Sequence, residues 1–345
     1  MKAAVFYGPG SVKVVERDKP EPGQGEVVVK NVVALSCGTD LKMFMRGHPK
    51  AKPPVVMGHE FSGVVESIGD GVNLVKHGDR VVAVNSAPCG HCVYCKLGNP
   101  NLCENLDESI LGFGIDGAYA EYVKLPQRVA SFNLYKIKDG VEYLEAAMLE
   151  PLSCVVRAHR LVHIDVGDAV AVIGSGPIGL FHIMLSGLRG AGKVVAIDVV
   201  EERLDFAARL GADITINASK EDAVQRVKDL TDGLGADVVV EAVGRTDTWE
   251  RSLNLARKGG SVILFGGCPS GTSANFDTYK VHYGELTVVG SFHHTPQDVI
   301  RALRLIESKK LRLRDLVTGE VKLDNILDVF HRLKEGKDIK IAIRF

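Results

Sequence analysis

The sequence predicts an α/β protein with two domains: a doubly wound parallel sheet in the middle of the chain, and a barrel-like domain of short strands built from the remainder. Three observations support this. A glycine-rich turn follows an apolar run near the middle of the chain, strands alternate with helices after it, and short strands separated by Gly and Pro precede it. With 345 residues the chain is long enough for two hydrophobic cores.

The glycine-rich turn has the spacing G-x-G-x-x-G and follows the apolar run 170–173. The first glycine permits a tight turn, the second lets the backbone approach a pyrophosphate, and the third lets the helix lie close to the strand. The helix N-terminus then offers free N–H groups to phosphates. The turn therefore predicts a dinucleotide site, with a glycine turn in some other α/β protein as the alternative. Its members are Gly174, Ser175, Gly176, Pro177, Ile178 and Gly179.

Asp198 ends the second apolar run, where a carboxylate would accept hydrogen bonds from the adenosine ribose. Its charge would repel a 2′-phosphate, so the sequence favours NAD over NADP. Arg203 is interpreted either as a contact to the adenine or a phosphate of the cofactor, or as a solvated charge on a helix face.

Residues 150–286 are expected to form the cofactor domain. Six strand-like runs, from AVAVIG to LTVVGSF, alternate with helical stretches such as TWERSLNLARKGG. Ligands bind at the carboxyl ends of parallel strands. The residues expected to border the nicotinamide there are Val243, Gly244, Phe265, Gly266, Ser291 and Phe292.

Residues 1–149 and 287–345 are expected to form the second, mostly antiparallel domain. It carries Cys37-Gly38-Thr39-Asp40 after one apolar run and Gly58-His59-Glu60 before another. A thiolate and an imidazole at strand ends are good zinc ligands, and Glu60 can bind the metal or hold its water. Taken alone, such residues are more often structural than catalytic.

Four cysteines crowd into residues 88–104 together with turn-forming Pro and Gly. Four thiolates close together suit a closed tetrahedral zinc site that stabilises the fold, with an iron–sulfur cluster as the main alternative and paired disulfides as the third. His91 lies inside this lobe and is expected to be exposed. The predicted ligands are Cys89, Cys92, Cys95 and Cys103.

These motifs, with the stretch Glu150-Pro151-Leu152-Ser153, resemble the zinc-dependent medium-chain dehydrogenases of the alcohol, sorbitol and threonine dehydrogenase group. The resemblance covers essentially the whole chain and implies a Rossmann domain and a GroES-like catalytic domain. It implies a catalytic zinc held by Cys37, His59 and Glu60. Glu150 points to the polyol branch, in which this glutamate binds the zinc or its water. Cys154 is interpreted as a core cysteine, with a zinc-binding thiolate as the alternative.

The same resemblance bears on the substrate pocket. Polyol dehydrogenases have an Arg-Tyr pair where this chain has His293 and His294, which would suit a sugar acid or a different hydroxyl pattern, or would cover the rim of a subunit interface. His48 and Phe113 are expected to border the pocket. Thr39 is expected to pass on the substrate's hydroxyl proton, with His48 completing the relay; the alternative for Thr39 is a turn hydrogen bond.

The expected function is zinc-dependent, reversible hydride transfer from a secondary alcohol of a polyol, sugar or sugar acid to NAD. Alternatives are an L-threonine 3-dehydrogenase, a simple secondary alcohol dehydrogenase, and a non-enzymatic redox sensor that is stabilised by zinc and binds a dinucleotide. The net charge of −1 gives no reason to expect nucleic acid or a membrane surface as a partner. No secretory h-region or membrane-spanning run is present, so a cytoplasmic homodimer or homotetramer is expected.

Overall fold

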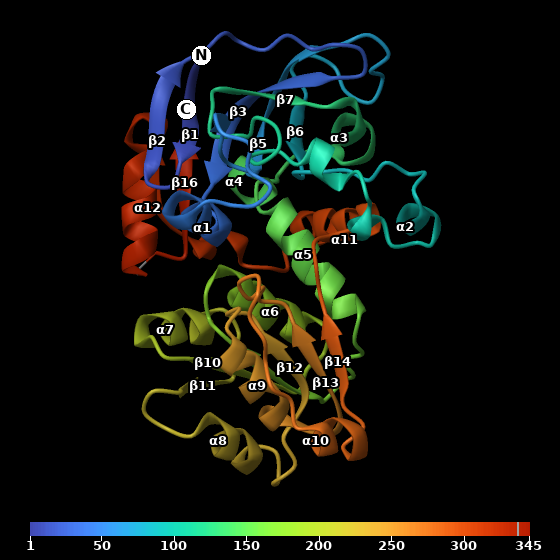
Figure 1. Cartoon of the computed structure of the whole chain (residues 1–345), viewed down its shortest axis with the longest axis vertical. Helices are drawn as coiled ribbons and strands as arrows, with labels where there is room; N and C mark the ends of the chain where they lie inside the picture. The colour runs from blue at the N-terminus through green and yellow to red at the C-terminus, as the bar shows by residue number, and fades with distance from the viewer. Residues whose placement is uncertain (337) are drawn as a thin grey trace. The chain divides into compact units, whose positions relative to one another are not determined.

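The computed structural model describes every residue except Lys337. Contacts within the chain divide it into two units. Unit 1 comprises Met1–Ser153, His294–Lys309 and Leu313–Phe345, so that both chain ends belong to it; unit 2 comprises Cys154–His293 and Lys310–Arg312. The predicted α/β class is confirmed, with a parallel sheet in unit 2 and two sheets in unit 1 (Figure 1).

Unit 2 is built on a six-stranded sheet in the order β11-β10-β9-β12-β13-β14, in which every neighbouring pair is parallel. The order reverses between β9 and β12, which is the topological switch point of a doubly wound sheet. Each of the six strands overlaps one of the predicted runs, although β13 begins at Ala256, before the predicted run SVILFGG. Their bounds are Ala169–Ile173 (β9), Lys193–Asp198 (β10), Ile214–Asn217 (β11), Ala236–Glu241 (β12), Ala256–Leu264 (β13) and Thr287–Gly290 (β14).

The helices of unit 2 connect these strands. One prediction was wrong: the stretch 248–260 is not helical throughout, because α9 ends at Leu255 and β13 begins at the next residue. Parallel pairing with β12, including Ala236 with Ala256, takes precedence over the helical pattern there. The helices are α6 (Pro177–Leu188), α7 (Glu201–Arg209), α8 (Ala223–Asp229), α9 (Thr246–Leu255) and α10 (Thr278–Tyr283), and α5 (Leu149–Arg160) carries the unit boundary between Ser153 and Cys154.

The expected domain boundary at residues 286/287 also needs correction. The segment from Thr287 to His293 belongs to unit 2. The reason is that β14 completes the parallel sheet by pairing with β13, with Val262 opposite Val288. The chain therefore returns to unit 1 only at His294.

Unit 1 holds a seven-stranded sheet and a separate three-stranded sheet, β2-β1-β4. The larger sheet runs β15-β16-β3-β5-β6-β8, and β7 pairs with β3. Its pairs are antiparallel as expected, except that β15 and β16 are parallel because helix α12 provides the crossover between them. The strands are Lys2–Gly8 (β1), Ser11–Glu16 (β2), Val27–Leu35 (β3), Val55–Val56 (β4), Glu60–Ile68 (β5), Arg80–Ala83 (β6), Tyr122–Leu125 (β7), Leu134–Lys136 (β8), Val317–Lys322 (β15) and Lys340–Arg344 (β16).

A single large cluster of buried side chains from these strands, including Phe6, Phe61 and Ile341, forms the main core of unit 1. The helices of unit 1 are α1 (Gly38–Arg46), α2 (Val93–Lys96), α3 (Gln127–Phe132), α4 (Tyr143–Ala146), α11 (Pro296–Glu307) and α12 (Ile326–Glu335), and α1, α3 and α12 contribute buried residues to this core. Short 3₁₀ turns cover Pro100–Leu102, Leu106–Ser109, Leu313–Leu316 and Leu323–Asn325.

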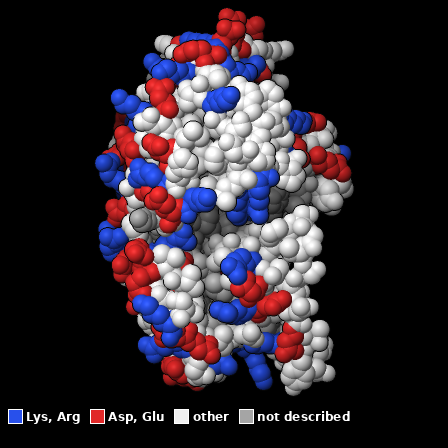
Figure 2. Space-filling view, turned by 60° about the vertical axis from the view of Figure 1, so that its left-hand side comes forward, with Lys and Arg blue, Asp and Glu red and all other residues white. Residues whose placement is uncertain are grey.

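The surface carries both signs of charge. Acidic and basic side chains are interspersed over the face seen in Figure 2, in keeping with a net charge of −1. Among the helices that the structure describes, none has the length and apolar character needed to cross a bilayer.

Candidate functional site

Cys37 caps the N-terminus of α1. The N–H of Thr39 donates to Cys37 Sγ at 3.5 Å, and the N–H of Cys37 donates to Asp40 Oδ2 at 3.0 Å, so that Cys37 and Asp40 form a capping box. These two hydrogen bonds fix the position of the Cys37 sulfur at the start of the helix.

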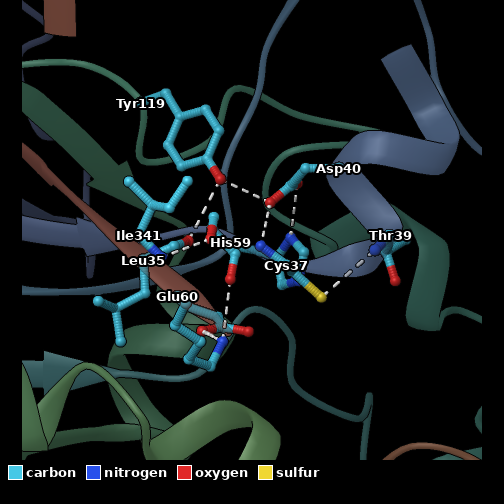
Figure 3. A network of polar contacts seen from close by, with 10 residues as sticks. Leu35, Cys37, Thr39, Asp40, His59, Glu60, Tyr119 and Ile341 are labelled. Atoms are coloured by element: carbon cyan, nitrogen blue, oxygen red, sulfur yellow. Dashed lines mark hydrogen bonds and ion pairs between the residues drawn. The ribbon is translucent and has the colours of Figure 1, made fainter. Parts of the chain in front are cut away.

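His59 and Glu60 stand at the start of β5, and Glu60 pairs in register with Leu35 at the end of β3. The side chains of His59 and Glu60 are almost completely buried. One ligand atom from each of Cys37, His59 and Glu60 lies within 4.8 Å of the other two. The structure thus brings together three residues that the sequence places on separate segments (Figure 3).

Asp40 orients the imidazole of His59. Asp40 Oδ1 lies 3.3 Å from His59 Nδ1, and that buried nitrogen has no other polar partner among the described residues. Burial lowers the pKa of His59, but the negative charges of Asp40 and Cys37 outweigh it, so the pKa lies well above the ordinary value. A carboxylate on one ring nitrogen leaves the other free for a metal, as in many metal-bound histidines.

Lys340 on β16 donates to Glu60 Oε2 at 2.5 Å and to the carbonyl of Ser36 at 3.0 Å. Burial raises the pKa of Glu60 to about 7 against the opposing pull of Lys340. The second carboxylate oxygen of Glu60, Oε1, is buried and has no hydrogen-bond partner in the part of the chain that the structure describes. The unpaired carboxylate oxygen of Glu60, the sulfur of Cys37 and the imidazole of His59 together are a set of ligands that fits Zn²⁺.

The other residues expected at this site do not belong to this group of three. Glu150 is not part of the set within 4.8 Å, although its charge further raises the pKa of Glu60. Thr39 is partly buried in the first turn of α1. Cys154 is only partly buried, so its interpretation as a core cysteine was wrong.

Phe113 lies between a predicted pocket residue, His48, and a predicted zinc ligand, His59. Its ring centroid lies 4.8 Å from that of His48 and 5.4 Å from that of His59. Burial lowers the pKa of His48, and the charge of Lys50 adds to this effect. His48 and Phe113 are therefore neighbours of the candidate metal ligands.

The two consecutive histidines, His293 and His294, belong to different units. His293 belongs to unit 2, has a φ of 60° and stacks on Phe292. His294 belongs to unit 1, is 3% exposed and lies with Nε2 3.4 Å from Asn85 Oδ1. The expectation that both histidines cover a rim was wrong for His294, because its side chain is packed inside.

The sulfur atoms of the four-cysteine lobe all lie within 4.8 Å of one another. The N–H of Cys89 points at Cys103 Sγ and that of Cys92 at Cys89 Sγ, at 3.2 and 3.3 Å. A backbone N–H from His91 lowers the pKa of Cys89 to about 6, which favours the thiolate that a metal requires. The side chain of His91 is exposed, as expected. Four converging sulfurs with donated N–H groups fit a closed zinc site.

In unit 2 the glycine turn joins β9 to α6. Gly174 has a φ of 93°, and a Cβ on Gly179 would lie 1.7 Å from the carbonyl oxygen of Gly174. A Cβ on Gly176 would meet nothing within 4 Å, so the backbone there is open to a ligand. Pro177 occupies the first helical position, followed by Ile178. Only glycine fits the first and third positions of this turn.

Asp198 closes the turn from β10. Its Oδ2 accepts the N–H of Ser175 at 2.6 Å, and its Oδ1 accepts those of Val199 and Val200 at 2.7 and 3.0 Å. A cavity of about 390 Å³ beside it is lined by Gly174, Gly176, Asp198, Arg203 and Val243 among others. The glycine turn, the acid and Arg203 thus share one cavity, whose walls are largely apolar.

The carboxyl ends of β12, β13 and β14 carry the other predicted cofactor contacts. Glu241 Oε1 accepts the N–H groups of Val243 and Gly244 at 3.0 and 2.9 Å. Trp249 Nε1 donates to the carbonyl of Gly266, and the N–H of Ser291 donates to Leu264. Phe265 meets His182 edge to face, whereas Phe292 is 52% exposed.

The sequence matches two family descriptions: "Alcohol dehydrogenase GroES-like domain" over residues 23–138 and "Zinc-binding dehydrogenase" over residues 177–308. It is also 35% identical to a sorbitol dehydrogenase of Halalkalibacterium halodurans, with 99% of both chains covered. The chain belongs to the zinc-binding dehydrogenases. The resemblance drawn from the sequence motifs is thereby confirmed.

Two further relatives of this zinc-binding dehydrogenase are informative. An L-threonine 3-dehydrogenase of Pyrococcus abyssi is 33% identical over 99% of this chain and 97% of its own. A zinc-binding dehydrogenase of Sinorhizobium meliloti, whose crystal structure contains NADP, superposes with a TM-score of 0.92 at 30% identity over 100% of this chain and 99% of the other.

Sequence reasoning missed three residues around the candidate metal site of this dehydrogenase: Asp40, Tyr119 and Lys340. Figure 3 labels the first two. Asp40 belongs to the motif Cys37-Gly38-Thr39-Asp40, but the motif alone assigns it no role. Lys340 had a readable signal, since a lysine inside the apolar run IKIAI is out of place unless it is paired. Nothing local marks Tyr119.

Proposed function

We propose that this dehydrogenase transfers hydride reversibly between a secondary alcohol of a polyol, sugar or sugar acid and NAD. The observation that carries the proposal is the buried convergence of Cys37, His59 and Glu60 within 4.8 Å. The glycine turn and Asp198 line one cavity, which would bind the dinucleotide. Membership of the zinc-binding dehydrogenase family argues against the alternative of a non-enzymatic redox sensor.

The candidate site residues would have different roles in this reaction. Cys37, His59 and Glu60 would hold the catalytic zinc, with Glu150 as a second carboxylate whose charge acts on Glu60. Zinc, when bound, supplies a Lewis acid that makes a substrate hydroxyl more acidic. Thr39 and His48 would carry the released proton, because a hydroxyl both donates and accepts and the lowered pKa of His48 keeps its imidazole neutral. The four-cysteine lobe would hold a structural zinc.

The substrate class rests on chemistry shared by the relatives. Sorbitol and L-threonine both carry a secondary hydroxyl beside a second polar group. A substrate with adjacent polar groups therefore suits this site better than a simple alcohol. L-Threonine is the second candidate, favoured by the 33% identity to a threonine dehydrogenase.

A substrate screen combined with metal analysis tests this function. The purified chain should contain two zinc ions and reduce NAD with a polyol, sugar acid or threonine. Cys37→Ser and His59→Ala should each abolish turnover, because each removes a ligand, while the dinucleotide still binds with unchanged affinity. Full turnover in either variant would remove the metal from the mechanism.

We propose NAD as the preferred cofactor because the carboxylate of Asp198 faces the adenosine cavity. Arg203, which lines the same cavity, provides some complementarity to NADP. Asp198→Ala should reduce the ratio of kcat/KM with NAD to that with NADP by about tenfold or more, because it removes a charge that repels the 2′-phosphate; tenfold corresponds to about 1.4 kcal/mol. An unchanged ratio would argue against the ribose contact.

We also propose a homodimer or homotetramer. Strand β14 lies at the edge of its sheet and has no fully buried residue. Among the described residues it pairs with β13 alone, so its free side can pair with a second copy. Light scattering that gives the mass of one chain at micromolar concentration would contradict this.

A further inference from the structure

Asp40 contacts the segments of two candidate zinc ligands at once. It is 1% exposed, its Oδ2 accepts the N–H of Cys37 at 3.0 Å, and its Oδ1 lies 3.3 Å from His59 Nδ1. Rotation of this one carboxylate would therefore disturb both Cys37 and His59. What fixes the rotation of Asp40 also fixes the geometry of the metal site.

The hydroxyl of Tyr119 donates to Asp40 Oδ2 at 2.6 Å and also lies 3.2 Å from the carbonyl of Leu35 (Figure 3). A hydrogen bond to a carboxylate is shorter and stronger than one between neutral groups. Without it, Asp40 Oδ2 would keep only the N–H of Cys37 as a donor in the described structure.

The ring of Tyr119 cannot move away from this position. Its side chain is completely buried, and a Cβ on Gly58 would lie 2.2 Å from its Cδ1, so the ring packs directly on the backbone that precedes His59. The backbone of Tyr119 is held on both sides, by its N–H to Met57 and by its carbonyl from Ala4. A fixed ring delivers the hydroxyl to a fixed point.

A phenylalanine would fill the same volume without burying a hydroxyl. A buried hydroxyl is costly unless it is hydrogen-bonded, so its place here points to a function for the bond with Asp40. We propose that Tyr119 is a positioning residue of the metal centre: its hydroxyl locks Asp40, and Asp40 in turn aligns His59 and the Cys37 segment for zinc. This inference rests on the proposed zinc site.

Tyr119→Phe in the full-length, zinc-loaded protein tests the inference. Competition with a chromophoric chelator should give about tenfold weaker zinc affinity at the Cys37–His59–Glu60 site, the low end of the effect of removing outer partners of metal ligands. The four-cysteine site in the same molecule should keep its affinity. After cobalt replaces zinc at the Cys37–His59–Glu60 site, the visible absorption of Tyr119→Phe should differ from that of the wild type.

Tyr135→Phe is the matched control. It also removes one tyrosine hydroxyl from unit 1, but that hydroxyl donates to the carbonyl of Phe132, away from the metal site. An unchanged affinity and an unchanged cobalt spectrum in Tyr119→Phe would overturn the inference. So would an equal weakening of both zinc sites together with a lower unfolding midpoint, since that result is a general loss of structure.

The wild type separates this inference from the proposed function. If it binds two zinc ions but oxidises no alcohol, the function fails while the effect of Tyr119→Phe on zinc affinity still decides the inference. If it is active and Tyr119→Phe binds zinc equally well, only the inference fails. If it binds no zinc beyond the four-cysteine site, both fail.

Discussion

Lys340 and Glu60 form an ion pair that is almost fully buried, since Lys340 is 1% exposed and Glu60 is 0% exposed. Burying two charges is expensive, and such pairs are kept only with close geometry and further hydrogen bonds. Lys340 has both, because it also donates to the carbonyl of Ser36. The pair fixes the last strand of the chain to the segment that carries Glu60.

Lys340→Met should destabilise the protein by about 3–5 kcal/mol near pH 8, because it leaves a buried carboxylate without its partner. Urea unfolding at equilibrium measures the loss. The control is Lys2→Met, whose ion pair with Asp324 has side chains 45% and 55% exposed; its cost should stay below about 1 kcal/mol. Equal losses in the two variants would show that burial of the pair is unimportant.

At the scale of residues, chemistry that is written in short motifs was predictable, and chemistry that depends on distant partners was not. The capping motif at Cys37 and the His59-Glu60 pair are local. Tyr119 gives its hydroxyl to Asp40 from 79 positions away, and no spacing rule links the two. The same holds for the enclosure of His294, which depends on its packing against Asn85.

At the scale of elements, the turn between β9 and α6 uses its glycines for different purposes. Gly179 is needed for packing, since a Cβ there would overlap the carbonyl oxygen of Gly174. Gly176 has a φ of −72°, which any residue adopts, and space around it. The need for glycine at Gly176 therefore comes from a ligand and not from the fold.

This difference gives a paired test. Gly179→Ala should lower the free energy of unfolding by more than about 2 kcal/mol, because backbone must shift to make room. Gly176→Ala should change it by less than about 0.5 kcal/mol but weaken binding of the dinucleotide, because the methyl group blocks the approach of the pyrophosphate. Denaturant unfolding and cofactor titration measure the two effects. Strong destabilisation by Gly176→Ala would refute the assigned division of roles.

Elements with a clear hydrophobic period and a turn signal were predicted correctly, and the errors occurred where pairing with a neighbouring strand determines the secondary structure. The six strands of unit 2 were predicted because each contains a short apolar run. The stretch 256–260 has the residues of a helix end, yet pairing with β12 makes it a strand. The parallel arrangement of β15 and β16 likewise depends on α12, whose crossover direction the sequence does not encode locally.

At the scale of the whole molecule, stability should depend on two buried histidines in unit 2. His159 Nε2 and His182 Nδ1 lie 2.9 Å apart, and both side chains are completely buried. Burial lowers the pKa of His182 to about 3 and that of His159 well below its usual range, with the charge of Arg189 also acting on His159. Both imidazoles are therefore neutral in the folded protein.

Because the unfolded chain takes up these protons near pH 6.5 and the folded chain does not, the contribution of both groups to stability is complete above pH 6.5 and is lost as pH falls. Between about pH 7.5 and 5.5 the wild type should lose about 2.7 kcal/mol more than the double variant His159→Gln/His182→Gln. Urea unfolding at each pH measures this. His163→Gln, which alters an 82% exposed side chain, should retain the wild-type dependence; parallel curves for wild type and double variant would contradict the prediction.

The division into two cores was predictable from the change of pattern along the chain, but its boundaries were not. The sequence suggests a break before Thr287, whereas β14 and the residues up to His293 stay with the parallel sheet. A boundary depends on which neighbours a strand finds, and hydrophobic pattern alone leaves that choice open.

The 280 positions between Glu60 and Lys340 have a consequence for biosynthesis. Unit 2 is nearly one continuous stretch and can fold on the ribosome as soon as residue 293 has emerged, whereas unit 1 must await the final strand. Until Lys340 has been synthesised, Glu60 lacks the buried cation that it pairs with in the fold. The candidate metal centre at Cys37, His59 and Glu60 would therefore be completed late in synthesis, and a chain that stops before Lys340 should fail to complete it.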